Sequence, residues 1–329
     1  MNSFNRLCVL DTPYSLLVYL VYSSEDDIKN TFFVFGKNMS KGLEKYINVY
    51  YITETQSLLN KRTFRWLYYR YIKYFKLPII NKGTTLFCHD HLPFSSVIIS
   101  NNNYTMIEDS PDICSNYING KMHERILKSR KSIKNKLYNF LYGNLYDKVF
   151  AENAQCDSIL MTKKDCAKYI SNKKHIVFSL QEYWDKSSSE KKELILRIFN
   201  VNDTDISIMR KYKTILFTQP LTDIISENRQ KKVFSYILSH YSPNEILIKV
   251  HPRDKINYKE LFPKYSVFKK QIPSQIIDLL DIKFDRVVTC FSTAVTMFNY
   301  PIKIDWYGTE IDDELFKKVG HIAPPQKKS

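Results

Sequence analysis

Short apolar runs recur through the first half of the chain and alternate with longer segments of mixed polarity. The runs are rich in β-branched and aromatic residues and lack strict apolar–polar alternation, which is typical of parallel strands covered on both faces. Between them, residues 55–76 and 120–142 carry apolar side chains at helical spacing and are predicted as helices. The predicted strands of this half are residues 7–11, 31–36, 48–53, 84–90, 104–109, 148–152 and 158–162.

A second alternating series follows residues 182–213, a polar stretch that is predicted as helix plus linker. Two successive β/α series predict an α/β protein with two Rossmann-like domains, residues 1–205 and 206–329, and a ligand cleft between them. The elements predicted in the second series are strands 214–219, 245–250, 286–291 and 303–308, helices 226–240 and 273–281, and a helix that begins near Ser292.

Composition narrows the classes of partner and the compartment. The formal net charge of +15 favours an anionic partner, which is a nucleic acid, an anionic lipid or an acidic substrate. Only 7 glycines are present, which argues against a glycine-rich nucleotide loop, and the 6 cysteines form no CxxC pair, which indicates reduced thiols. We see no secretory signal pattern, and the apolar run 14–22 is too short to span a bilayer. We therefore expect a cytoplasmic protein, either free or peripheral on the inner face of the cytoplasmic membrane.

Polar side chains follow three predicted strands of the second half. Asp223 comes after strand 214–219, His251 and Pro252 after strand 245–250, and Ser292 and Thr293 after strand 286–291. Ligands of open parallel sheets bind at the carboxyl ends of the strands. A helix N-terminus lined by hydroxyl groups suits a phosphate, and a histidine near neutrality can protonate a departing phosphate oxygen.

Arg253 completes this group, and its members also have ordinary structural explanations. Asp223 can accept a proton from an attacking hydroxyl group, or cap the helix that begins near Ser226. Arg253 can add positive charge, or pair with a nearby carboxylate. Ser292 and Thr293 after a strand are most often an N-cap. Because such residues recur at successive strand ends, the functional and the structural interpretations carry about equal weight.

The first half contributes acidic and imidazole side chains at its own strand ends. Glu108 and Asp109 are adjacent, so their side chains point to opposite faces, and one can face a ligand while the other caps the next segment. His89 and His91 could form a metal site or an imidazole pair near an acceptor. Without further clustered ligands, we favour the interpretation without a metal.

The stretch 60–76 interleaves Lys and Arg with aromatic residues, among them Trp66, Tyr68, Tyr69, Tyr71, Tyr74 and Phe75. Basic and aromatic side chains together can stack on single-stranded nucleic acid or lie at a membrane interface. The third interpretation is an amphipathic helix that packs its aromatic residues inward.

Four of these stretches resemble motifs of the bacterial lipooligosaccharide sialyltransferases, glycosyltransferase family 52. "VHPRD" is similar to the family's His-Pro motif and "TCFSTAVTM" to its Ser-Ser/Thr motif. "IEDS" is similar to its acidic motif, with Ser110 in place of the glycine. "TQPLTD" lies where the family has a Pro-Asp segment, with two extra residues between Pro220 and Asp223.

The resemblance implies a GT-B-type fold and inverting, metal-independent transfer without a cofactor. The donor would be CMP-sialic acid, and the acceptor a terminal galactose of a surface glycan, lipooligosaccharide or capsule, with α-2,3 as the expected linkage. It implies no nucleic-acid partner; peripheral membrane contact and a homodimer are further expectations. The alternatives are another nucleotide-sugar glycosyltransferase of GT-B fold, or a basic protein that binds nucleic acid or membranes.

The resemblance also assigns roles to residues. His251 would be the general acid, and Ser292, Thr293, Pro252 and Arg253 would bind the donor and its phosphate. Asp223 is the favoured base and Asp109 its rival, while Glu108 and Asp109 would lie on the acceptor side.

Overall fold

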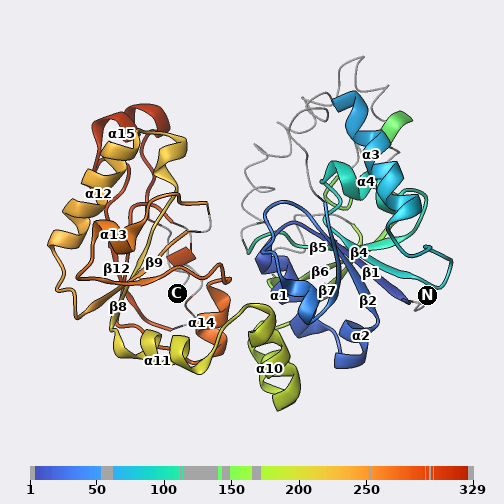
Figure 1. Cartoon of the computed structure of the whole chain (residues 1–329), viewed down its shortest axis with the longest axis horizontal. Helices are drawn as coiled ribbons and strands as arrows, with labels where there is room; N and C mark the ends of the chain where they lie inside the picture. Colours follow the sequence, from blue (N-terminus) through green and yellow to red (C-terminus); the bar gives the residue numbers. More distant parts are fainter. Residues whose placement is uncertain are drawn as a thin grey trace. The chain divides into compact units, whose positions relative to one another are not determined.

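The chain divides into two compact units, residues 1–198 and 199–329, in a computed structural model that describes most of the sequence. The expected boundary, between residues 205 and 206, falls within helix α11 (Asp203–Lys211). Each unit is an α/β structure with its own sheet (Figure 1). The described residues are 4–52, 62–111, 113, 140–142, 149–164, 172–251, 253–292, 294–295, 298 and 300–324.

Unit 1 is built on a seven-stranded sheet in which every strand pair is parallel. The order β3-β2-β1-β4-β5-β6-β7 reverses direction between β1 and β4. This reversal is the point at which an open parallel sheet presents a ligand site. The strands are β1 (Arg6–Leu10), β2 (Thr31–Phe35), β3 (Asn48–Tyr51), β4 (Thr85–Cys88), β5 (Tyr104–Ile107), β6 (Cys156–Met161) and β7 (Lys174–Val177).

Helices cover both faces of this sheet because its strands are apolar on both sides (Figure 1). Leu7 and Val9 pack in the core that includes α3 and α4, while Tyr19 of α1 packs edge-on against Phe33 and Phe87 from the opposite face. The described helices of unit 1 are α1 (Pro13–Tyr22), α2 (Glu25–Lys29), η1 (Leu43–Lys45), α3 (Arg62–Phe75), α4 (Pro93–Ile99), α9 (Leu180–Asp185) and α10 (Ser189–Ile198).

Unit 2 contains a five-stranded parallel sheet in the order β10-β9-β8-β11-β12. Here the order reverses between β8 and β11. The strands are β8 (Thr214–Phe217), β9 (Ile246–Lys249), β10 (Ser266–Phe268), β11 (Arg286–Thr289) and β12 (Lys303–Trp306). The helices are α11, η3 (Leu221–Asp223), α12 (Glu227–Ser239), α13 (Tyr258–Leu261), α14 (Gln275–Leu279) and α15 (Asp313–Val319).

Side chains of the central strands of unit 2 alternate between two faces. Leu216, Ile248 and Val288 pack in one core with residues of α12, and Leu315 of α15 joins them. Figure 1 shows α11 and α14 on the opposite face of the sheet. The α/β class with two Rossmann-like units, predicted from the pattern, is confirmed.

One predicted strand is wrong. Residues 149–152 form a turn, in which Phe150 and Ala151 have φ angles of 56° and 65°. The buried carboxylate of Asp90 accepts their backbone N–H groups at 2.8 and 2.6 Å and stabilises this left-handed conformation. The apolar residues of this turn are buried, as they would be in a strand, so the hydrophobic pattern alone could not distinguish a turn from a strand.

Other elements differ in extent from the expected ones. Strands β7 and β10, which are short and lie at sheet edges, are absent from the prediction, and residues 182–213 contain three helices. Most of the helix predicted at 120–142 lies outside the described residues. Near Ser292, the described residues 294 and 295 form a short 3₁₀ turn.

Two further observations concern the cysteines and the lengths of the helices. Cys8, Cys88, Cys156 and Cys290 are buried and unpaired, while Cys114 and Cys166 lie outside the described residues. Within the described ranges, every helix is too short or too polar to cross a lipid bilayer.

Candidate functional site

The carboxyl end of β8 lies between those of β9 and β11 because β8 pairs with both. Beyond the strands, two hydrogen bonds extend these pairings. The His251 backbone N–H donates to Thr218 Oγ1 at 2.9 Å, and the Phe291 N–H donates to Gln219 Oε1 at 2.9 Å. His251 and Ser292 therefore follow the two strands that flank β8, as expected if the three strands are neighbours.

The imidazole of His251 is half-buried and has a defined tautomer in its neutral form. Its Nδ1 accepts the backbone N–H of Arg253 at 3.1 Å, so the ring hydrogen is on Nε2. Burial lowers the pKa of His251, and the positive charges of Arg253 and Lys249 lower it further. In the free protein, His251 is thus a neutral hydrogen-bond donor, and a nearby anion would favour its protonation.

Asp223 and Arg253 meet beside this histidine. Asp223 is the last residue of η3, and its Oδ2 lies 3.6 Å from Arg253 Nη1. The two side chains are 49% and 67% exposed, so both are accessible to a ligand. The structure thus brings Asp223 to the same edge as His251, where it serves as the counterion of Arg253.

Ser292 forms a local turn at the end of β11. Its N–H donates to Thr289 Oγ1 at 3.1 Å, and its Oγ accepts the Ala294 N–H at 3.3 Å. The candidate residues Pro252 and Thr293 lie outside the described residues.

Gln230 of α12 joins the two loops that carry Asp223 and His251. It is fully buried; its Oε1 accepts the Thr222 N–H at 2.6 Å, and its Nε2 lies 2.9 Å from Asp254 Oδ1. The sequence contained a signal for it, since Gln230 begins the otherwise apolar series Val233, Phe234, Ile237 and Leu238 at helical spacing.

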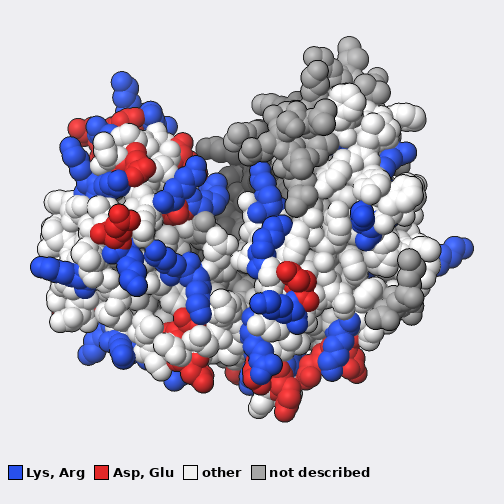
Figure 2. Space-filling view, in the orientation of Figure 1, with Lys and Arg blue, Asp and Glu red and all other residues white. Residues whose placement is uncertain are grey.

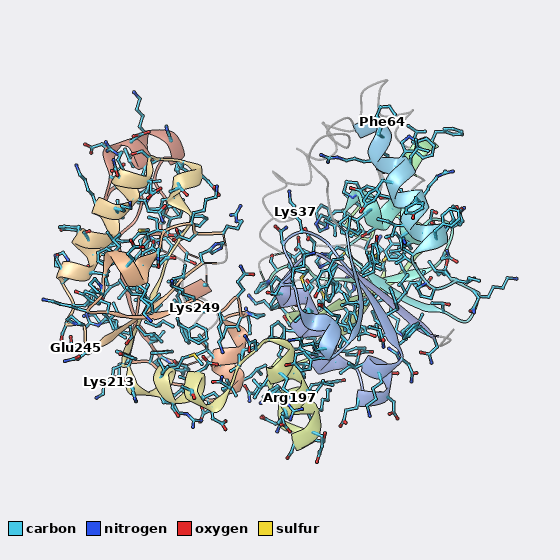
Figure 3. All side chains as sticks on the ribbon, in the orientation of Figure 1. Lys37, Phe64, Arg197, Lys213, Glu245 and Lys249 are labelled. Atoms are coloured by element: carbon cyan, nitrogen blue, oxygen red, sulfur yellow. The ribbon has the colours of Figure 1, made fainter. Side chains whose placement is uncertain are left out.

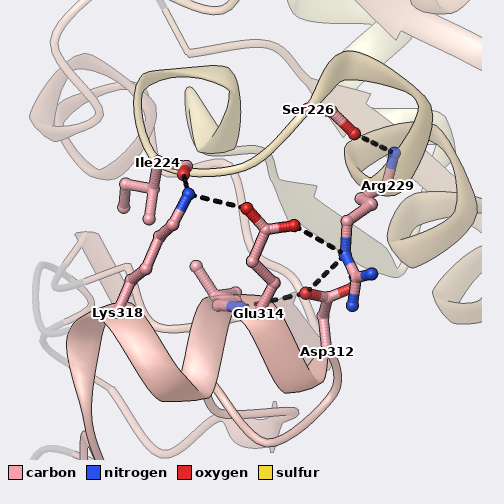
Figure 4. Close-up of polar contacts among 7 residues, drawn as sticks. Ile224, Ser226, Arg229, Asp312, Glu314 and Lys318 are labelled. Carbon is pink, nitrogen blue, oxygen red and sulfur yellow. Dashed lines mark hydrogen bonds and ion pairs between the residues drawn. The ribbon is translucent and has the colours of Figure 1, made fainter.

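Side chains of helix α15 bind the segment that follows η3 (Figure 4). Lys318 Nζ donates to the carbonyl oxygen of Ile224 at 2.8 Å. Arg229 Nε donates to Asp312 Oδ2 at 2.9 Å and lies 3.4 Å from Glu314. These contacts hold the segment that follows Asp223 against α12 and α15.

Unit 1 presents a second polar edge at its own point of reversal. Asp109 follows β5, and its Oδ2 lies 3.7 Å from His91 Nε2. Asp11 follows β1 and accepts hydrogen bonds from Asn38 at 3.0 and 2.7 Å. Burial raises the pKa of Asp11, which the hydrogen bonds from Asn38 partly oppose. Sequence reasoning missed Asp11, although it follows a strand just as Asp109 does.

Glu108 points inward, away from its neighbour Asp109. Its Oε1 accepts from Tyr14 OH at 2.6 Å, from the Thr162 N–H at 3.0 Å and from Thr162 Oγ1 at 2.7 Å. Its Oε2 is buried and has no hydrogen-bond partner among the described residues, and burial raises the pKa of Glu108 to about 7. Glu108 therefore ties β5 to α1 and β6, while Asp109 is the acidic residue at the surface.

The two histidines after β4 have different surroundings. His89 is buried; its Nε2 lies 2.6 Å from Ser15 Oγ, and burial lowers its pKa well below the usual value. Its ring stacks on His91 at 5.5 Å, and His91 in turn stacks on Phe150 at 5.1 Å. The stack holds His91 beside Asp109, at the carboxyl edge of the sheet.

Comparison with known sequences identifies the family. The sequence model of glycosyltransferase family 52 matches residues 133–315, which is more than half of the chain. The chain belongs to glycosyltransferase family 52. An uncharacterized protein of Haemophilus influenzae is 28% identical to this family member over 328 residues, covering 95% of this chain and 97% of that protein.

Solved structures show the same fold at low sequence identity. A 2,6-sialyltransferase of Photobacterium sp. JT-ISH-224, solved with CMP and lactose, is 14% identical at a TM-score of 0.56, over 92% of this chain and 70% of that one. An α-2,3-sialyltransferase of Photobacterium phosphoreum is 12% identical at a TM-score of 0.53, over 92% of this chain and 89% of that one. The GT-B domain of a Photobacterium damselae sialyltransferase is 13% identical at a TM-score of 0.51, over 91% of this chain and 89% of that one. This family 52 glycosyltransferase therefore has the predicted GT-B-type fold.

Glu108 makes the stability of this glycosyltransferase depend on pH. Its folded-state pKa of about 7 lies above the ordinary value of 4.5, so the folded protein keeps a proton that the unfolded chain releases. The resulting stabilisation is complete below pH 4.5 and is lost as pH rises through about 7. Between pH 4.5 and 8, we expect the free energy of unfolding of the wild-type protein to fall by roughly 3 kcal/mol relative to that of Glu108→Gln. Urea unfolding at a series of pH values measures this difference.

The exposed Glu190→Gln substitution is the matched control and should leave this pH dependence unchanged. Parallel stability curves for wild type and Glu108→Gln would contradict the assignment.

Proposed function

We propose that this chain is a sialyltransferase. It transfers sialic acid from CMP-sialic acid to a terminal galactose of a bacterial surface glycan, in lipooligosaccharide or capsule, with inversion, α-2,3 linkage and no metal. The observation that carries the proposal is the meeting of His251, Arg253 and Ser292 around the end of β8 in a family 52 chain. A solved structure of the same fold holds CMP and lactose, which are the corresponding leaving group and a galactose-containing acceptor.

The electrostatics of unit 2 suit an anionic donor. CMP-sialic acid carries a phosphate and a carboxylate, and Arg253 together with the Nε2–H of His251 offers positive charge and a hydrogen bond. Lys and Arg outnumber Asp and Glu by 49 to 34, and Figure 2 shows them spread over the visible face of each unit. Thr293 and Pro252 belong to this proposed donor site by their place in the motifs.

His251 is the proposed general acid. When the bond between the sugar and the phosphate oxygen breaks, its electron pair remains on the phosphate, which becomes a dianion unless it receives a proton. The donor's negative charge opposes the pKa-lowering effect of Arg253 and Lys249, so the bound donor promotes protonation of His251. The imidazolium then donates its Nε2 proton to the leaving CMP.

Two carboxylates compete for the role of base, and in this proposal it belongs to Asp109. Inversion requires the base on the face of the sugar opposite the leaving group, as in inverting glycoside hydrolysis. Asp223 lies beside the proposed acid, and its charge is engaged by Arg253. Asp109 lies at the edge of unit 1 next to His91, which can accept the proton in turn. In this proposal Asp109 activates the acceptor hydroxyl and Asp223 orients Arg253.

Helix α3 supports the proposal that the enzyme contacts a membrane, where a glycolipid acceptor would lie. Aromatic and aliphatic side chains form an exposed stripe along it, although Tyr69 and Ile72 pack inward. Tyr74 and Phe75 are 68% and 75% exposed. The stripe comprises Phe64, Leu67, Tyr71, Tyr74 and Phe75, whose spacing places them on one face.

The positive charge of α3 favours an anionic lipid surface as its partner. The helix contains no Asp or Glu, and its Arg70 and Lys73 lie over aromatic rings, at 5.0 Å from Trp66 and 6.0 Å from Tyr74. Figure 3 places Phe64 at the outer end of α3, and the surface over α3 in Figure 2 is white and blue. Aromatic side chains with flanking cations are the composition of an interfacial anchor.

The proposed activity is tested with CMP-sialic acid and a lactoside in the presence of EDTA. We expect CMP release and a sialylated lactoside. His251→Ala and Asp109→Asn should each lower kcat by about 10²-fold or more, while Asp223→Asn should act mainly on KM for the donor. Asp157→Asn, at an exposed carboxylate of unit 1, is the control and should be neutral.

Failure to release CMP or to sialylate any member of a broad panel of galactosides would overturn the function. Normal turnover in Asp109→Asn with loss in Asp223→Asn would instead return the role of base to Asp223.

Membrane contact is tested by flotation with vesicles of phosphatidylglycerol and phosphatidylethanolamine. We expect wild-type protein to float at low salt and Tyr74→Ser/Phe75→Ser to remain unbound. Tyr236→Ser/Phe316→Ser removes two exposed aromatic residues of unit 2 and should float like wild type. Equal flotation of both double variants, or a stripe that proves to be a dimer contact without affinity for vesicles, would contradict the proposal.

A further inference from the structure

Lys249 is a buried lysine that has no anionic partner among the described residues. The last residue of β9, it is only 4% exposed, and among the described residues no carboxylate pairs with it and no acceptor takes its hydrogen bonds. Its Nζ lies 5.9 Å from the centroid of the Phe268 ring. Burial lowers the pKa of Lys249 to about 8. A buried charge without a partner is costly to the folded protein.

Lysines elsewhere in the chain show how such groups are ordinarily satisfied. Lys191 is buried in unit 1, and its Nζ donates to the carbonyl oxygen of Val21 at 2.8 Å. Lys73 donates to Val97 O and Ser100 Oγ, at 3.1 and 2.8 Å. Lys270 pairs with Asp205 at 2.5 Å. The described surroundings of Lys249 offer none of these arrangements.

The position of Lys249 points to the donor site. Ile248 and Val250 pack in the core with α12, so the alternation of the strand places Lys249 on the opposite face, in step with His251 two residues later. Figure 3 shows Lys249 at the end of β9 opposite Glu245, which precedes the strand. Besides burial and the charge of Arg253, the positive charge of Lys249 lowers the pKa of His251.

We propose that Lys249 is a binding residue for the phosphate of the nucleotide-sugar donor, with its ammonium as the buried counter-cation of the leaving CMP. The assignment rests on the proposed function. Negative charge on the phosphate grows as the glycosyl–phosphate bond breaks, and a cation of low exposure acts through a weakly screening medium. Lys249 therefore binds the departing CMP more strongly than the intact donor, which accelerates bond cleavage.

The proposal predicts that Lys249 opposes stability in the free protein and supports ligand binding. Lys249→Met keeps the length of the side chain and removes the charge. We expect its Tm without nucleotide to rise, its affinity for CMP in calorimetry to fall at least tenfold, and the increase in Tm caused by CMP to shrink. Lys249→Arg, which keeps the charge, should retain part of the affinity.

Lys191→Met is the matched control because its ammonium has an acceptor in unit 1. It should show no gain in Tm and an unchanged affinity for CMP. Wild-type affinity for CMP in Lys249→Met would overturn the proposal. If Lys249→Met does not fold, Lys249→Gln takes its place in the same comparison, and failure of both to fold would also overturn it.

A comparison with UMP separates this proposal from the proposed donor. Wild-type protein that binds UMP and not CMP would contradict CMP-sialic acid as donor, and loss of UMP affinity in Lys249→Met would still support Lys249 as a phosphate ligand. Wild-type protein that binds neither nucleotide would overturn both.

Discussion

Parallel pairing of β8 with both β9 and β11 is the constraint on which the candidate donor site depends. It brings the segments after three strands to one edge, although they lie up to about seventy residues apart in the chain. The hydrogen bond from His251 N–H to Thr218 and the one from Phe291 N–H to Gln219 continue the pairing past the ends of the strands. Gln230 and α15 then hold the loop of Asp223, so each polar group at this edge has a fixed support.

The charge distribution at this edge favours an anionic ligand. Lys249 has no counterion among the described residues, and Arg253 has a carboxylate at the outer distance of an ion pair. Both cations lower the pKa of His251, whose Nδ1 is already occupied by a backbone N–H. A bound phosphate would relieve the unfavourable charge of Lys249 and at the same time promote protonation of the imidazole. Ligand binding and activation of the acid are thus one electrostatic event in this account.

The sequence predicted what local patterns encode. Apolar runs identified eight of the central strands, and polar residues at their ends identified Asp223, His251, Ser292 and Asp109. It could not show that residues 149–152 turn around the Asp90 carboxylate, because that bond joins residues sixty positions apart. Nor could it show which of Glu108 and Asp109 turns inward, which the contacts with Tyr14 and Thr162 decide. Lys249 was missed because a polar residue within an apolar strand acquires meaning only from its surroundings, and the apolar series that Gln230 begins did not show which groups its amide would join.

The pKa of His251, followed by NMR with and without CMP, tests the central claim most directly. In the free protein we predict a pKa below the ordinary value of 6.5, since burial, Arg253 and Lys249 all disfavour the imidazolium. Saturating CMP should raise that pKa above its free value and shift the Nε2 resonance if, as proposed, the phosphate binds against that nitrogen. A His251 pKa and Nε2 resonance that CMP leaves unchanged, although CMP binds, would contradict the account.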